Sequence, residues 1–413
     1  MLENNKHENR EFDVIVWGAS GFTGRLVVEY LAAKYPTGTT LNWAVGGRSR
    51  QKVTEILDGL QITGRLPEII IADSHDRASL DNMTARTRVM LSTVGPYAKY
   101  GSELVESCVK NGTDYCDLAG ESQWIRRMID QHEKEARKTR SRIVVSCGFD
   151  SIPSDIGVHC LTQHALEVSE QPCKSITMLV RAIKGGASGG TVASILNLVD
   201  EVRQDRSIAR ILANPYALNP EDKRHGPDQR EQDNALFNED VGAWTGPFMM
   251  AAINTRIVRR TNALLDYPYG KEFRYSEATI TGSGLKGRLK ATMMAVGPKL
   301  LFLAAAIPPI RRLLIQPRIP KQGEGPTRNE RENGYFNLLM IGKLHDGGTL
   351  RLRIKGNRDP GYGSTSKMLA ESAICLAKDK IAIEGGIWTP AAAMGDALLQ
   401  RMKTNAGLSF ELE

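Results

Sequence analysis

A glycine-rich turn that follows a short apolar segment constrains the fold of this chain more than any other feature. Residues 14–17 are apolar, and glycines then recur at every third position as Gly18, Gly21 and Gly24. In a strand–turn–helix unit the first glycine permits the tight turn, the second lets backbone approach a diphosphate, and the third lets helix and strand pack closely. The N-terminus of such a helix attracts phosphate through free N–H groups and its dipole. The pattern favours a dinucleotide-binding turn over a turn with a structural role alone.

The segment around this turn alternates short apolar runs with amphipathic stretches. The apolar runs lie at residues 12–17, 41–46, 68–72, 89–93, 114–118 and 142–146. Buried strands separated by amphipathic helices are typical of an α/β fold with a doubly wound parallel (Rossmann) sheet. Such sheets bind ligands at the carboxyl ends of their strands, so the loops that follow the strands are the expected binding positions.

Beyond about residue 155 the alternation stops. The sequence therefore predicts a nucleotide-binding domain over residues 1–153 and a second, α+β domain for substrate binding or oligomerisation over residues 154–385. A helix and a strand over residues 386–413 complete the chain, and their return to the first domain is one alternative.

The composition narrows the classes of function. The 413 residues are 41% hydrophobic and 24% charged, which is ordinary for a soluble globular protein. The net charge of +7 is diffuse and accompanies no aromatic–basic motif, so no nucleic-acid partner is expected. Six scattered cysteines without CxxC pairs indicate reduced thiols and no metal site. Residues 1–11 are polar and contain no secretion signal, so we expect a cytoplasmic protein, either free or peripheral to the inner face of the membrane.

The loop after the second apolar run indicates the kind of dinucleotide. An NAD site would place an acid here, against the ribose 2′-hydroxyl. The sequence instead has Arg48 and Arg50, with Ser49 between them. A 2′-phosphate needs cationic, multidentate donors, and an acid would repel it. NADP(H) is therefore the predicted cofactor, against the alternative of a solvated helix start with incidental charge.

Further loops are expected beside the cofactor. Asp73 follows the third run and could bind the adenine or cap the next helix. After the fourth run, Gly95 allows a close approach of the backbone, and Tyr97 would point toward the nicotinamide. The residues expected to bind the cofactor are Gly18, Ser20, Gly21, Phe22, Thr23, Gly24, Arg48, Ser49, Asp73, Val94, Gly95 and Pro96.

The loop after the sixth run contains three residues that could carry chemistry. Asp150 and Asp155 are expected to be helix caps or loop anchors. A nucleophilic role for Cys147 is not expected, because no histidine is near in sequence and hydride transfer needs no thiolate.

Two later segments have unusual composition. Residues 184–191 form a second glycine-rich loop, for which closure over the substrate or nicotinamide and a flexible connection are equally open. Residues 286–331 carry ten Lys or Arg against two Glu, around an apolar run at 300–309 that is too short to span a bilayer. A helix lying on a membrane, a docking face for an acidic carrier protein, a lid over a greasy substrate and a subunit interface are the alternatives for this segment.

Several motifs together resemble the saccharopine dehydrogenase-like oxidoreductases. They lie at residues 18–24, 47–49, 94–97, 120–121 and 147–153. Three further segments look like the trans-acting enoyl reductases of mycobacterial lipid biosynthesis. They lie at residues 184–191, 254–260 and 389–398. The resemblance covers nearly the whole chain and implies an NADPH-dependent reductase that acts on the C=C bond of a carrier-bound acyl or polyketide chain.

Enoyl reduction adds a hydride to the β-carbon of the thioester and a proton to the α-carbon. Tyr97 is the catalytic residue that we expect to supply this proton, because its loop should lie on the nicotinamide side. The expected partners are the acyl substrate, an acidic carrier protein, a membrane surface or a second copy of the chain. The alternative functions are a reductase of another small carbonyl or imine metabolite, and a non-catalytic lipid- or membrane-associated protein on the same scaffold.

Overall fold

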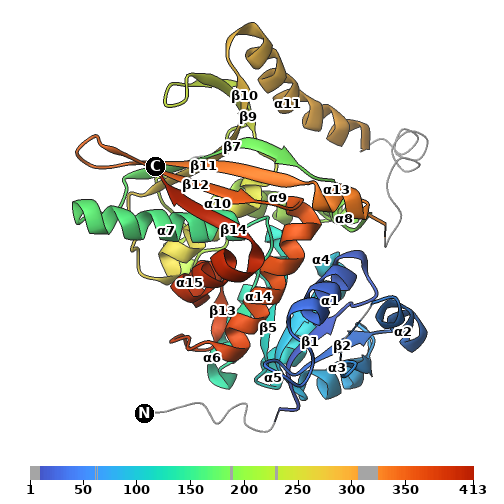
Figure 1. Cartoon of the computed structure of the whole chain (residues 1–413). Coiled ribbons are helices and arrows are strands. Elements are labelled where there is room, and N and C mark those ends of the chain that lie inside the picture. Colours follow the sequence, from blue (N-terminus) through green and yellow to red (C-terminus); the bar gives the residue numbers. More distant parts are fainter. Residues whose placement is uncertain (1–9, 61, 63, 187–188, 228–230, 306–323) are drawn as a thin grey trace.

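The computed structural model describes residues 10–413 except 61, 63, 187–188, 228–230 and 306–323, and it contains two seven-stranded sheets (Figure 1). The strands of the first sheet are β1 (Phe12–Trp17), β2 (Trp43–Gly47), β3 (Glu68–Ile71), β4 (Thr87–Ser92), β5 (Asp114–Cys116), β6 (Arg142–Val144) and β13 (Gly386–Trp388). In space they run β13-β6-β5-β4-β1-β2-β3, and all neighbours are parallel. The predicted doubly wound sheet is confirmed, and its order reverses between β1 and β4, where such sheets bind ligands.

Helices cover both faces of this sheet, as a parallel sheet of buried apolar strands requires. The helices between its strands are α1 (Phe22–Lys34), α2 (Arg50–Asp58), α3 (Arg77–Thr84), α4 (Tyr97–Tyr100), α5 (Ser102–Lys110) and α6 (Ser122–Thr139). Along β1, Ile15 and Trp17 pack in one core cluster with α3, α5 and α6. Val14 and Val16 pack in the other cluster with α1 and with α14 (Thr365–Lys378), a helix from the far end of the chain.

The second sheet is mixed. Its strands are β7 (Ser175–Lys184), β8 (Leu236–Asn238), β9 (Ala243–Pro247), β10 (Arg274–Gly282), β11 (Tyr335–Lys343), β12 (Thr349–Gly356) and β14 (Leu408–Leu412). They run β14-β12-β11-β7-β10-β9-β8 in space, and β7 with β10 is the parallel pair among antiparallel neighbours.

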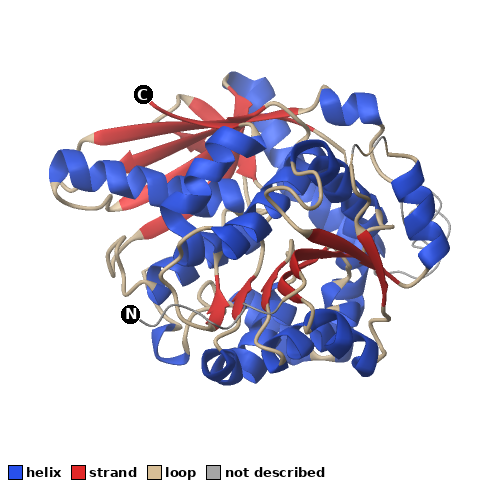
Figure 2. Cartoon of the chain, turned by 60° about the horizontal axis from the view of Figure 1, so that its bottom comes forward, coloured by secondary structure: helices blue, strands red, loops and turns tan. Residues whose placement is uncertain are grey.

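A layer of helices connects the two sheets (Figure 2). It includes α7 (Ile152–Ser169), α10 (Ala251–Leu264) and α15 (Pro390–Arg401), which pack on one another, and α7 and α10 also contact the second sheet. One core cluster runs from Val14 in the first sheet to Ile176 and Leu352 in the second. On the outer side of the second sheet lies α11 (Gly284–Ala305), against β9 and β10 (Figure 1). The remaining helical elements are α8 (Gly189–Gln204), α9 (Arg206–Ala213), η2 (Glu221–Lys223), α13 (Arg328–Glu332), η5 (Pro360–Ser364) and η6 (Met402–Ala406).

The C-terminal segment is divided between the two sheets. The short strand β13 extends the first sheet beside β6. The final strand β14 pairs antiparallel with β12, from Leu352 opposite Leu412 to Gly356 opposite Leu408. The alternative that the final strand returns to the first domain is therefore wrong. Strand pairing is a long-range choice, and β14 completes an edge that local sequence does not identify.

The basic stretch in α10 is buried. Arg256, Arg259 and Arg260 are each at most 5% exposed and donate to backbone carbonyls of neighbouring helices, loops and strands. Their acceptors are Leu212, Pro215, Tyr275, Leu218 and Ile387. Because guanidinium groups present several donors in a fixed plane, α10 can hold these segments together between the two sheets.

Candidate nucleotide-binding and catalytic site

The glycine turn connects β1 to α1 and leaves no room for a side chain at Gly18 or Gly24. Gly18 has a positive φ of 88°, and the N–H of Gly21 donates to its carbonyl at 2.9 Å. A Cβ at Gly24 would lie 2.1 Å from that carbonyl oxygen, and one at Gly18 would lie 2.6 Å from Cγ2 of Val94. Gly21 is the N-cap of α1 and supplies no side-chain cap, so the first amides of the helix remain available to an anion. This cradle fits a dinucleotide diphosphate.

The end of β2 lies beside this turn. A Cβ at Gly47 would be 4.0 Å from Oγ of Ser20. The loop after β2 therefore lies beside the loop after β1. Arg48 is exposed, and among the described residues it has no hydrogen bond or ion pair. Ser49 caps α2 by accepting from the N–H of Lys52 at 3.3 Å, and Arg50 donates to a backbone carbonyl. Arg48 is therefore the cation at this end that is available to a 2′-phosphate.

Two other predicted cofactor residues have protein partners. One carboxylate oxygen of Asp73 accepts from the N–H of His75 at 2.9 Å, while Asp76 is the N-cap of α3. Asp73 therefore does not cap α3, and its side chain instead stabilises a turn at the end of β3. The ring of Phe22 lies 5.1 Å from that of Tyr362 in η5, so it contacts the second half of the chain.

Tyr97 is a structural residue in this fold. It is 4% exposed, and its ring lies 5.3 Å from that of Trp124. Its hydroxyl donates to the carbonyl of Ser92 at 3.1 Å and accepts from the N–H of Leu118 at 3.4 Å. Burial raises the pKa of the hydroxyl well above its ordinary value. The hydroxyl thus joins the ends of β4 and β5, which disfavours the expected role of proton donor.

Glu121 anchors the loops at the same edge of the sheet. Its carboxylate accepts from the N–H groups of Tyr97 at 2.8 Å and Ala98 at 2.9 Å, and from the hydroxyl of Ser194 at 3.0 Å. Burial raises the pKa of this carboxyl, while the three hydrogen bonds oppose that shift. Glu121 therefore fixes the loop after β4 and ties it to α8 of the second half. Nothing local in the sequence identifies this contact, because its partners are 23 to 73 residues away.

The half-buried Asp150 differs from Glu121 in its contacts. It follows β6, and its Oδ2 would lie 4.0 Å from a Cβ placed on Gly120, in the loop after β5. Within the described residues its carboxyl has no hydrogen-bond partner. Burial raises its pKa to about 6. The expectation of a cap or loop anchor is therefore wrong for Asp150. It holds for Asp155, which accepts from Thr261 at 2.5 Å and from the N–H of Ala391 at 2.7 Å.

The remaining candidates lie around this edge. Gly185 and Gly186 of the second glycine-rich loop lie against Pro360 and Pro326, while residues 187–188 of that loop are outside the described residues. Cys147 is fully buried, and burial raises the pKa of its thiol well above the ordinary value, which disfavours the thiolate. No cluster of metal-binding side chains is found in the described part of the chain.

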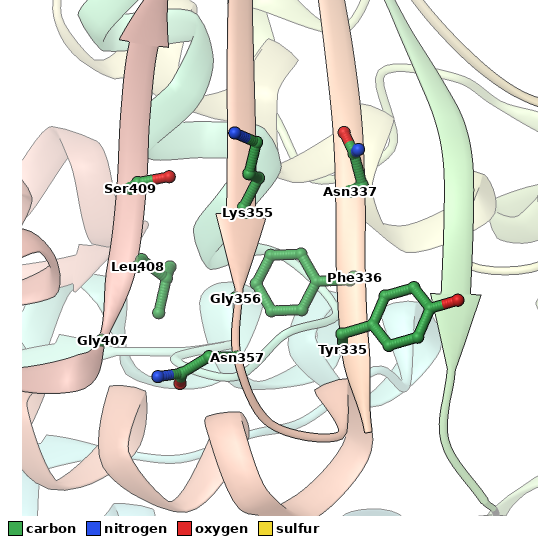
Figure 3. A pocket seen from close by; sticks show the side chains of 9 residues that line it. All are labelled: Tyr335, Phe336, Asn337, Lys355, Gly356, Asn357, Gly407, Leu408 and Ser409. Atoms are coloured by element: carbon green, nitrogen blue, oxygen red, sulfur yellow. The ribbon is translucent and has the colours of Figure 1, made fainter. Parts of the chain in front are cut away.

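A hollow of about 450 Å³ lies at the ends of β11, β12 and β14 (Figure 3). Its lining includes the apolar Phe336 and Leu408 and the polar Asn337, Lys355 and Ser409. None of the predicted cofactor-binding residues lines it. The hollow is therefore a separate feature of the second sheet.

Comparisons with known proteins agree with this geometry. Residues 14–145 match the family model of the saccharopine dehydrogenase NADP binding domain. A Mycobacterium tuberculosis protein named "Putative trans-acting enoyl reductase" is 40% identical over 412 residues, which cover 97% of each chain. A trans-acting enoyl reductase of Mycobacterium bovis is 36% identical over 404 residues, which cover 95% of this chain and 96% of the relative.

Two solved structures share the fold. Apo saccharopine dehydrogenase from Saccharomyces cerevisiae superposes with a TM-score of 0.54 at 12% identity, over 97% of this chain and 99% of the other. Homospermidine synthase from Legionella pneumophila in complex with NAD gives a TM-score of 0.52 at 10% identity, over 98% of this chain and 92% of the other. At these identities the likeness shows the architecture alone.

The fold and the nucleotide turn define the class of an NADP-dependent oxidoreductase. Within that class, the chain belongs to the family of the trans-acting enoyl reductases.

Proposed function

We propose that this protein is an NADPH-dependent trans-acting enoyl reductase, which reduces the C=C bond of an acyl or polyketide chain held on a carrier protein. The observation that carries the proposal is the identity of 36 to 40% to relatives of that name, over at least 95% of this chain. The glycine cradle supports the same cofactor, and so does Arg48, which has no partner among the described residues.

The geometry of the strand ends supports a set of residues that would bind the cofactor. The turn from Gly18 to Gly24, with Ser20 and Thr23, would hold the diphosphate at the N-terminus of α1. Arg48 would bind the 2′-phosphate, with Ser49 holding the start of α2 in place. Val94 lies next to Gly18, and the backbone of residues 94–96 would run along the cofactor. When bound, NADPH supplies the hydride for the β-carbon.

The proton for the α-carbon is assigned here to Asp150. A general acid works best when its pKa lies near the working pH and its proton is free to move to the substrate. Burial places the pKa of Asp150 at about 6, and no described protein group competes for its carboxyl. Glu121 does not meet the second condition, because three donors hold its carboxylate. Tyr97 does not meet it either, because its hydroxyl is used by the backbone.

The test measures NADPH oxidation with enoyl thioesters and, in parallel, with ketoacyl thioesters. The expected result is turnover of the enoyl substrate alone. Asp150→Asn should lower kcat about 100-fold or more, within the usual range for a general acid, while the Kd of NADPH is unchanged. Tyr97→Phe serves as the comparison and should leave kcat within a few fold. Because the donor must be protonated, kcat of the wild type should fall as the pH rises above about 6.

The outcomes separate the two parts of this proposal. Turnover of ketoacyl rather than enoyl substrates would replace the proposed function. Enoyl turnover that survives Asp150→Asn but not Tyr97→Phe would assign the role of proton donor to Tyr97. The proposed enoyl reduction would still stand.

A further inference from the structure

The helix α11 carries an apolar stripe that no other described part of the chain covers. The stripe consists of five exposed side chains, whose exposed fractions lie between 46% and 80%. They are Leu285, Leu289, Met293, Val296 and Leu300. At about 100° per residue, these positions fall within roughly 80° of the helix circumference. With a rise of 1.5 Å per residue, the stripe is about 22 Å long.

Cations border this apolar stripe on both sides. Lys286 and Lys290 lie along one border and Arg288 and Lys299 along the other, and all four are exposed. The helix contains no Asp or Glu. Two of the cations have partners, since Arg288 lies over the ring of Trp244 and Lys299 pairs with Asp233 at 3.2 Å. The exposed face of α11 thus has an apolar centre with positive charge along both borders.

The opposite face of α11 is the one that holds it to the protein. Gly287, Ala291 and Ala295 are buried, and a Cβ at Gly246 of β9 would lie 3.2 Å from Cα of Ala291. Small residues let the helix lie close on the sheet and direct its larger apolar side chains away from it. Figure 1 shows α11 as a ridge on the outer side of the second sheet, across that sheet from the nucleotide-binding half.

We propose that α11 docks the protein on an anionic lipid surface, lying in the interface with the apolar stripe among the acyl chains. A plane is complementary to a convex ridge, and anionic head groups on both sides match the two cationic borders. No helix of the described residues is long and apolar enough to cross a membrane, so the contact is peripheral. Peripheral docking goes beyond the proposed enoyl reduction and does not depend on it.

This occupant fits the face better than the other three considered from the sequence. A lid over the substrate would face the nucleotide turn, whereas α11 lies on the far side of the second sheet (Figure 1). A second copy of α11 would bring like charges together along both borders, which is unfavourable. An acidic carrier protein would match the charges, but a compact partner would cover a local patch, and this stripe runs the length of the described side chains of the helix.

The test is flotation of the purified full chain with vesicles of phosphatidylcholine, with and without phosphatidylglycerol. The wild type should float with the anionic vesicles, and the binding should weaken with salt. Leu289→Glu with Met293→Glu should abolish flotation. Lys286→Glu with Lys290→Glu should weaken it by at least about fivefold for each cation lost. NADPH binding should be unchanged in both variants.

Matched controls keep the result specific to α11. Val168→Glu changes another exposed apolar residue, 55% exposed, and should float as the wild type does. Lys134→Glu with Lys380→Glu reverses two exposed lysines elsewhere. The proposal is overturned if the wild type does not float, or if these controls weaken flotation as much as the α11 variants. It is also overturned if the wild type is a dimer that Leu289→Glu dissociates, because the stripe would then face a second copy.

Discussion

At the scale of single residues, Arg48 is the side chain that we expect to distinguish NADPH from NADH. Among the residues that the structure describes, it is the exposed cation at the end of β2 without a protein partner, while Arg50 donates to the carbonyl of Ile69. Charge-assisted hydrogen bonds are worth about 1.5–3 kcal/mol, or roughly 10- to 100-fold in affinity. Arg48→Ala should raise the Kd of NADPH by that factor in a fluorescence titration and leave the Kd of NADH nearly unchanged. Arg50→Ala is the control. An equal loss of NADPH affinity in both variants would show that recognition of the 2′-phosphate is shared along the loop.

Residues within a continuous local pattern could be predicted, and those whose role depends on distant partners could not. The positions of Gly18, Gly21 and Gly24 define their own turn, so the cradle follows from the spacing. Tyr97 looked available because its loop follows a strand, yet Leu118 and Trp124 bury it from the next βα unit. Asp150 looked like a cap because Asp often caps helices, and the lack of a protein partner is visible only in three dimensions.

At the scale of elements, the helix layer between the sheets contains a titratable carboxyl that joins three helices. Asp155 of α7 accepts from Thr261 of α10 and from the N–H of Ala391 in α15, and Thr261 also bonds to Thr389 at 2.6 Å. Burial raises the pKa of Asp155 to about 7, whereas an unfolded Asp titrates near 3.9. A protonated Asp155 could donate to Thr261, which would then donate to Thr389.

The raised pKa of Asp155 makes the free energy of unfolding depend on pH. Between about pH 4 and pH 7 the unfolded chain has lost a proton that the folded chain keeps, so Asp155 lowers the free energy of unfolding as the pH rises through that range. Asp155→Asn can keep both hydrogen bonds without titrating, so this variant should show a flatter pH dependence in urea unfolding. Asp222→Asn, at an exposed carboxyl, should retain the wild-type slope. Identical slopes for wild type and Asp155→Asn would show that Asp155 does not titrate in this range.

The helices and strands themselves were predictable to different degrees. The order of β1 to β6 follows from apolar runs that lie close in sequence and alternate with helices. The burial of the basic residues of α10 could not be predicted, because their acceptors are backbone carbonyls of a helix, a loop and two strands that lie far away in sequence. Three-residue strands such as β13 carry too little pattern for their partner to be read from sequence.

At the scale of the whole molecule, the first sheet is completed by residues that lie more than 200 positions later in the chain. The helix α14 packs on β1, β4 and β5, and β13 pairs with β6. The carboxylate of Glu371 in α14 also accepts from the hydroxyls of Tyr30 at 2.6 Å and Tyr35 at 2.7 Å. The sequence pattern over residues 12–150 indicates a self-contained domain. Alternation of apolar runs and amphipathic stretches shows which residues face a core, but it does not show which helix covers that core.

This dependence leads to an expectation for the separated N-terminal half. A fragment of residues 1–153 lacks α14, whose Leu369, Ala373 and Ile374 are at most 2% exposed in the full chain. Loss of this cover leaves part of one face of a parallel sheet open to water, which such sheets do not tolerate. The fragment should bind the dye ANS and unfold without a cooperative transition, whereas the full chain should unfold in a transition that NADPH moves to higher temperature. A fragment that melts cooperatively and binds NADPH would show that α1 alone protects that face and that the two halves fold independently.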